Sequence, residues 1–168
     1  MTKFRMSIQM PSKTLLAVDP GFDRIGVAIF SKGKLAFSDC IVTNRKLSHA
    51  ERLGEIGLAI KKIINKWKPK LLAIEKLFFN QTITTALKVS EARGVIIYEA
   101  SRLGLETVEY SPQEIKIAVT GYGKANKKQV EAMVRKLVSL PSRKKPWLDD
   151  ELDAIALGIT HLATKKGI

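Results

Sequence analysis

Acidic residues recur in three short stretches of this sequence. The runs LLAVD (residues 15–19) and LLAIE (residues 71–75) each consist of four apolar residues followed by an acid, and DDELD (residues 149–153) holds four acids. Clustered carboxylates repel one another unless cations lie among them, and an all-oxygen ligand set selects hard divalent ions such as Mg²⁺ or Mn²⁺. Two such ions can activate a water molecule and stabilise the leaving oxygen of a phosphodiester. If the fold brings these acids together, they indicate metal-dependent phosphodiester hydrolysis.

The elements predicted around these acids place them at the ends of strands and at the start of a helix. Four apolar residues before Asp19, and again before Glu75, are typical of strands buried on both faces, so each acid stands at the carboxyl end of a strand. Asp150 and Asp153 are three residues apart and therefore share one face of a helix. Each motif also has a purely structural interpretation, because Asp before Pro-Gly forms turns and acids in a first helical turn stabilise the helix dipole. The repeated pattern favours one shared site.

The rest of the chain predicts an α/β fold. Three strand patterns come first and are expected to be antiparallel neighbours, and helices and strands alternate after them, which favours a mixed five-stranded sheet with helices on both faces. Residues 1–13 are expected to form a flexible basic lead-in, and residues 14–168 a single domain. Helices are expected after Ser48 up to Pro69, from about 81 to 103 with Asn80 as N-cap, over 112–120, after Asn126 up to Pro141, and from 149 or 150 to 163.

The charge of the chain points to a polyanionic partner. With 29 lysines and arginines against 16 acids, the formal charge is +13, and residues 113–145 hold nine basic residues against two acidic ones. A folded domain this basic usually binds nucleic acid, although part of the excess also suits solvated helix faces. The basic surface would hold a phosphate backbone, while cations would offset the acidic pocket.

Other classes of protein fit the composition poorly. The sequence has no apolar run near the roughly 18 residues of a membrane span, and its first dozen residues lack the apolar core of a signal peptide. The single cysteine, Cys40, excludes an intrachain disulfide framework, and His49 and His161 lie too far apart to suggest a zinc cluster. We therefore expect a cytoplasmic protein that has no contact with membranes.

Four longer motifs resemble the RuvC family of Holliday junction resolvases, which has the ribonuclease H-like fold. They are DPG followed after four residues by Gly26, then AIEKLFFNQTITTALKVSEARGV, EYSPQEIKIAVTGYGKANKKQV and DDELDAIALGITH, in this order across residues 14–161. The resemblance implies a homodimeric, Mg²⁺-dependent endonuclease of recombination and repair, with two ions at each site and Mn²⁺ able to substitute. Such an enzyme nicks opposing strands of a four-way DNA junction symmetrically, leaves 5′-phosphate ends, and works with a branch-migration motor.

The same resemblance assigns roles to individual acids. It places the family's catalytic and metal-binding acids on Asp19, Glu75, Asp150 and Asp153. Asp150 is preferred over Asp149 because two residues separate the last two acids of the family pattern. Asp19 is expected to bridge both ions, and the other three acids to complete their ligands.

Positions that contact DNA, or a second subunit, are implied in the same way. Phe78 matches an aromatic residue at the junction's crossover, although its neighbour Phe79 is an alternative, and either could instead pack in the core. Lys116 and Lys127 match basic positions that contact DNA. The helix expected over residues 81–103, with its small side chains, matches the family's dimer interface.

Three other functions share part of these features. A related ribonuclease H-like nuclease that acts on RNA or on an RNA–DNA hybrid would carry the same acids, and a non-catalytic junction-binding protein would share the fold. An ATP-binding domain of the actin or sugar-kinase type also begins with strand, Asp and Gly, but that fold needs two such domains. The motifs beyond the acids favour the junction resolvase.

Overall fold

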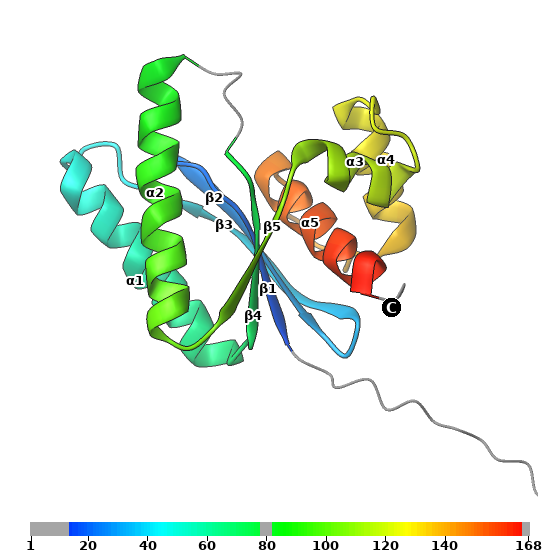
Figure 1. Cartoon of the computed structure of the whole chain (residues 1–168), viewed down its shortest axis with the longest axis horizontal. Coiled ribbons are helices and arrows are strands. Elements are labelled where there is room, and N and C mark those ends of the chain that lie inside the picture. The colour runs from blue at the N-terminus through cyan, green and yellow to red at the C-terminus, as the bar shows by residue number, and fades with distance from the viewer. Residues whose placement is uncertain (1–13, 78–81, 166–168) are drawn as a thin grey trace, which may run out of the picture.

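Five strands form one mixed sheet in the computed structural model, which describes residues 14–77 and 82–165 (Figure 1). The order across the sheet is β3-β2-β1-β4-β5; β2 pairs antiparallel with β1 and β3, and β4 pairs parallel with β1 and β5. The strands are β1 (Leu15–Asp19), β2 (Arg24–Ser31), β3 (Lys34–Val42), β4 (Leu71–Glu75) and β5 (Glu106–Tyr110). The predicted mixed five-stranded sheet is confirmed.

Helices cover both faces of this sheet, as predicted (Figure 1). One face packs against α1 (His49–Trp67) and α2 (Ile83–Arg102), and the other against α3 (Pro112–Thr120), α4 (Lys127–Leu137) and α5 (Asp149–Lys165). Alternate residues of β1 serve the two layers: Leu16 and Val18 pack with α1 and α2, whereas Leu15 and Ala17 pack with the other three helices. Because β1 is buried on both faces, its residues before Asp19 are all apolar.

Local sequence signals set most helix ends. Capping boxes begin α1 at Ser48, α3 at Ser111 and α4 at Asn126, where each cap side chain accepts from a backbone N–H three residues on. Helix α2 begins at Ile83, two residues later than expected, and the predicted cap Asn80 lies outside the described residues. The predicted lead-in 1–13 and both Phe78 and Phe79 also lie outside them.

The small residues of α2 serve packing within this chain. Ala92 and Ala100 are fully buried against the sheet and α1. A β-carbon added to Gly57 of α1 would lie 3.3 Å from a methyl group of Val95, so the two helices approach closely there. Of the small residues Ala86, Ala92, Gly94 and Ala100, the first, second and fourth are buried and Gly94 is exposed. Within the described ranges, no helix has both the length and the apolar character that crossing a bilayer requires.

Candidate active site

Asp19 and Glu75 lie side by side because their strands are parallel neighbours. The register pairs Val18 with Ile74, so the next residues of β1 and β4 both stand at the carboxyl edge of the sheet. Strand alternation also decides which way they point. Residues 15 and 17 of β1, and 71 and 73 of β4, face the layer formed by α3, α4 and α5, and the two acids continue this series.

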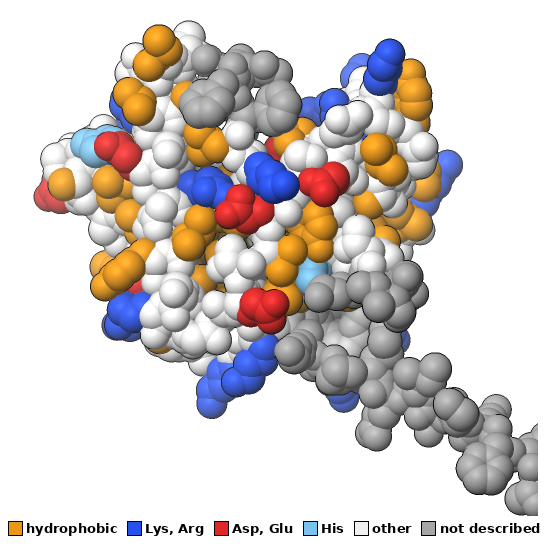
Figure 2. All heavy atoms as spheres, in the orientation of Figure 1, with side chains coloured by type: hydrophobic (Ala, Val, Ile, Leu, Met, Phe, Trp, Pro, Cys, Tyr) orange, Lys and Arg blue, Asp and Glu red, His pale blue; other side chains and the backbone are white. Residues whose placement is uncertain are grey.

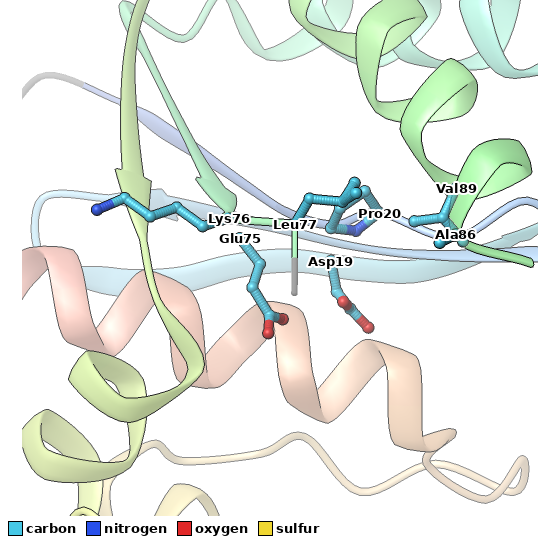
Figure 3. Close-up of a pocket in the computed structure, with 7 residues that line it drawn as sticks. All are labelled: Asp19, Pro20, Glu75, Lys76, Leu77, Ala86 and Val89. Carbon is cyan, nitrogen blue, oxygen red and sulfur yellow. The ribbon is translucent and has the colours of Figure 1, made fainter. Parts of the chain in front are cut away.

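A hollow opens beside the two carboxylates. Figure 3 shows Asp19 and Glu75 pointing to the same side, towards the ribbon of α5, while Lys76 points away from them. The hollow contains about 470 Å³ of empty space, part of it open solvent, and its wall on the α2 side is formed by Ala86 and Val89. It is therefore accessible from outside the protein.

The electrostatics of this pair are those of crowded carboxyl groups. Burial raises the pKa of Asp19 well above its usual range, and the charges of Glu75, Asp153 and Asp150 raise it further, against a smaller opposing effect of Lys127. Burial and the charge of Asp153 raise the pKa of Glu75 to about 7, although a hydrogen bond with Asp19 and the charge of Lys116 lower it. The acids repel one another, and a bound cation would relieve that repulsion.

Helix α5 brings the other acids to this edge by passing very close to β2. Gly26 of β2 is the ladder partner of Asp19, and a β-carbon built on Gly26 would lie only 1.7 Å from the carbonyl oxygen of Asp150. No side chain fits between the two backbones. Gly26, which the sequence motif singled out, is thus the residue that lets the start of α5 approach Asp19.

Asp150 is held at this contact by Arg24. Its Oδ2 atom is buried, makes no hydrogen bond within the described residues, and lies 2.9 Å from Arg24 Nη2 as an ion pair. The charge of Asp150 acts on both Asp19 and Asp153, whereas that of Asp149 acts on Asp153 and Lys127. This supports Asp150 rather than Asp149 as the third acid of the cluster.

Lys127 lies among the acids of α5. Its Nζ is 3.1 Å from Asp149 Oδ2 and 3.5 Å from Asp153 Oδ2. Burial disfavours the charge of Lys127, but Asp153 and Asp149 outweigh burial and raise the pKa of the lysine. Burial raises the pKa of Asp153, with Lys127 opposing that shift. Elsewhere on the surface too, acidic and basic side chains lie next to one another, as at the centre of the face shown in Figure 2.

The donor set fits a hard divalent cation, although the side chains are not gathered around one. Across residues 14–77 and 82–165, no three Asp, Glu, His or Cys side chains already stand in an arrangement that could hold a metal ion. Two of the acids have cationic partners instead, since Arg24 pairs with Asp150 and Lys127 pairs with Asp153. Carboxylates alone converge here from β1, β4 and α5, and protein cations neutralise part of their charge. An all-oxygen donor set of this kind is one that hard divalent cations prefer.

Sequence reasoning missed two arginines that hold this site together. Arg93 of α2 donates from Nε to the backbone carbonyl of Glu75 at 3.0 Å, and its Nη2 lies 2.8 Å from Glu109 Oε2. Arg93 stands within the SEARGV motif, but no role was assigned to it there. Arg24 could have been found from strand alternation, because it shares the α5 face of β2 with Gly26.

Comparison with known proteins gives matches along nearly the whole chain. Residues 15–161 match the family model described as crossover junction endodeoxyribonuclease RuvC. A protein of that name from Halothermothrix orenii is 43% identical over 151 residues, covering 88% of this chain and 90% of the relative. The protein of the same name from Alkaliphilus metalliredigens is 40% identical over 151 residues, covering 88% and 91%.

Two solved structures superpose on most of the chain. T. thermophilus RuvC in complex with Holliday junction substrate superposes with a TM-score of 0.83 at 27% identity, covering 92% of this chain and 95% of that chain. The yeast mitochondrial Holliday junction resolvase Ydc2 superposes with a TM-score of 0.68 over 95% of this chain and 82% of its own, and at 13% identity it shows the fold alone. The predicted fold class, a ribonuclease H-like α/β domain, is confirmed.

Proposed function

The chain belongs to the RuvC family of crossover junction endodeoxyribonucleases, and from this premise we propose that it cuts four-way DNA junctions. It makes symmetric nicks in two opposing strands and leaves 5′-phosphate ends. The observation that carries this proposal is the placement of Asp19 and Glu75 at neighbouring ends of β1 and β4, with Asp153 of α5 near enough for its charge to act on both. That cluster lies in a strongly basic protein, as binding of a phosphate backbone requires.

The four acids would hold divalent metal ions, and we infer two Mg²⁺ ions, for which Mn²⁺ can substitute. Such ions, when bound, lower the pKa of a water molecule and stabilise the leaving oxygen of a phosphodiester. Asp19, whose carboxyl interacts with the other three acids, would hold the ions together with them. Arg24 and Lys127, which pair with Asp150 and Asp153 in the metal-free protein, would compete with metal for these two carboxylates. Lys127 would also be available to pair with a phosphate of the DNA.

DNA binding rests on basic side chains around the acids. Lys116 lies near enough to Glu75 to lower its pKa, and Lys127 reaches the acids of α5 from the start of α4. Both are therefore beside the place where a scissile phosphate would lie. Phe78 is proposed as the side chain that stacks at the crossover, with Phe79 as the alternative.

A homodimer suits a substrate with two-fold symmetry. Helix α2 carries an exposed apolar stripe, with Ile83, Leu87 and Tyr98 80%, 60% and 63% exposed, and the exposed Gly94 lies on the same stripe. We propose this stripe as the contact between two subunits. The dimer would act on recombining DNA in the cytoplasm, together with a branch-migration motor.

A cleavage assay on matched substrates tests the proposal. A labelled four-way junction, a linear DNA duplex and an RNA–DNA hybrid of the same sequence are each incubated with Mg²⁺ or with chelator. We expect paired, symmetric nicks on the junction alone, and none with chelator. Cleavage of the hybrid with the junction left intact would instead identify a ribonuclease, and tight junction binding without any cleavage would identify a binding protein.

A further inference from the structure

Glu151 is the acid of residues 149–153 that turns away from the candidate active site. Its side chain is only 3% exposed and points towards β3, where Ser38 Oγ donates to Glu151 Oε1 at 2.7 Å. Arg143 supplies two further hydrogen bonds, from Nη1 to Oε1 at 2.9 Å and from Nη2 to Oε2 at 2.7 Å. A buried carboxylate with this two-pronged partner is compensated in both charge and hydrogen bonding.

Arg143 lies in the connection between α4 and α5, residues 138–148. Other residues of this connection contact the Arg143 side chain. Its guanidinium carbon lies 3.6 Å from the centre of the Trp147 ring, and its Nη2 also donates to the carbonyl oxygen of Pro146 at 3.1 Å. Carboxylate, ring and carbonyl thus hold the arginine from three sides. Arg143 and its neighbours Lys144 and Lys145 all lie at the surface, but of these three only Arg143 binds a buried carboxylate.

Helix geometry links this pair to the metal-binding acids. Successive residues of an α-helix are turned by roughly 100°, so residues two apart point to nearly opposite sides. Glu151 and Asp153 are two apart, and Asp150 is one residue from Glu151. When Glu151 is held against β3, Asp153 is directed to the opposite side and Asp150 to the flank beside Arg24, which matches the observed ion pairs.

We propose that Arg143 and Glu151 form a positioning pair, which fixes the rotation of the first turn of α5 so that Asp150 and Asp153 face Asp19 and Glu75. Gly26 sets how near the helix comes to β2, and the Arg143–Glu151 pair sets which side of it faces the site. This inference rests on the proposed metal-binding role of Asp150 and Asp153. It assigns no contact with DNA to Arg143.

The test compares a variant that removes the pair with variants that alter one partner. In Arg143→Met/Glu151→Leu, both charges are replaced by apolar side chains of similar length, so no buried carboxylate is left unpaired. Arg143→Lys keeps the charge but loses the two-pronged geometry. Lys144→Met, one residue along the same connection, is the matched control. Each protein is assayed for melting temperature, for Mn²⁺ affinity without DNA, for junction affinity, and for single-turnover cleavage of bound junction.

We expect the double variant to melt near the wild-type temperature but to bind Mn²⁺ about 10-fold more weakly, the low end of the range for lost outer-shell partners, because the pair acts on the ligands only through the helix. Its single-turnover rate should fall, recover partly in excess Mn²⁺, and leave junction affinity unchanged. The Mn²⁺ affinity of Arg143→Lys should lie between that of the double variant and that of the wild type. Lys144→Met should keep the wild-type Mn²⁺ affinity.

Two results would overturn the positioning role. Unchanged Mn²⁺ affinity and cleavage rate in a less stable double variant would make the pair purely structural, and a weaker junction affinity with an unchanged rate would make Arg143 a DNA contact. Failure of the proposed function is a separate result, because the wild-type protein itself would then neither bind Mn²⁺ nor cut the junction.

Discussion

Gly26 and Asp150 touch backbone to backbone, although they belong to a strand and a helix far apart in the sequence. A β-carbon at Gly26 would lie 1.7 Å from the Asp150 carbonyl oxygen and 3.1 Å from the amide nitrogen of Glu151. Because Gly26 is also the ladder partner of Asp19, this contact sets the separation between Asp19 and the acids of α5.

Gly26→Ala should therefore push the start of α5 away from β2. We expect a loss of stability of about 1–3 kcal/mol, as for other overpacked sites, together with a marked loss of single-turnover cleavage. Gly54→Ala is the control, because Gly54 is exposed on α1 with open space at its β-carbon position, and alanine there should be neutral or stabilising. Urea unfolding and junction cleavage measure both effects. Wild-type stability and cleavage in Gly26→Ala would refute the close approach.

The stability of the metal-free protein should fall as the pH rises. The pKa of Glu75 is about 7 in the folded chain and about 4.3 in an unfolded one. Between these values the folded state holds a proton that the unfolded chain has released, so the stabilisation is complete below the unfolded value and is lost as the pH rises through 7. The raised pKa of Asp19 acts in the same direction.

Melting curves in chelator across this pH range measure the effect. Glu75→Gln should flatten the dependence, and Mg²⁺ should raise the wild-type melting temperature more above pH 7 than below it, because the ion favours ionised carboxylates. A wild-type melting temperature that stays level or rises with pH in chelator would contradict the crowding of these acids.

Lys116 and Lys127 should each contribute one phosphate contact. Replacing either by Met should weaken junction binding. It should also reduce the slope of log affinity against log salt by the contribution of about one phosphate contact. Lys62, exposed on α1 on the other side of the sheet, is the control. Binding titrations at several salt concentrations measure this slope. If the slope of the Lys116 or Lys127 variant equals that of Lys62→Met, that lysine does not contact the DNA backbone.

Arg93 should affect cleavage without affecting binding of the junction. Arg93→Met removes the donor to the Glu75 carbonyl oxygen and the ion pair with Glu109, so the end of β4 loses a tether to α2. We expect slower single-turnover cleavage at unchanged junction affinity. Arg102→Met is the control on the same helix, because Arg102 pairs only with Glu99 among the described residues. Equal cleavage rates in the two variants would show that Arg93 does not help to position Glu75 for cleavage.

Strand patterns made most of the fold predictable. The apolar run of β1 packs against both helical layers, and the same alternation directs Asp19 and Glu75 towards α5. Capping residues gave the starts of α1, α3 and α4 for a local reason, since each cap bonds within its own turn. The start of α2 was harder to predict, because Thr82 makes no side-chain capping bond.

Contacts between distant segments could not be predicted in the same way. The acids of residues 149–153 look alike in the sequence, yet Asp150 pairs with Arg24 of β2 while Glu151 turns to Ser38 of β3. Their directions depend on how α5 lies across the sheet. Lys127 was predicted as a DNA contact, and its ion pairs with Asp149 and Asp153 add a second role that only the packing of α4 beside α5 reveals.

The most direct test of the account is junction cleavage by Asp19→Asn, measured beside junction binding by the same protein. Asparagine keeps the size of the side chain and leaves the basic surface intact, but it removes the carboxylate that interacts with the other three acids. We predict that paired nicking in Mg²⁺ is lost while the affinity for the four-way junction stays within a few-fold of wild type. Normal nicking by Asp19→Asn would contradict it.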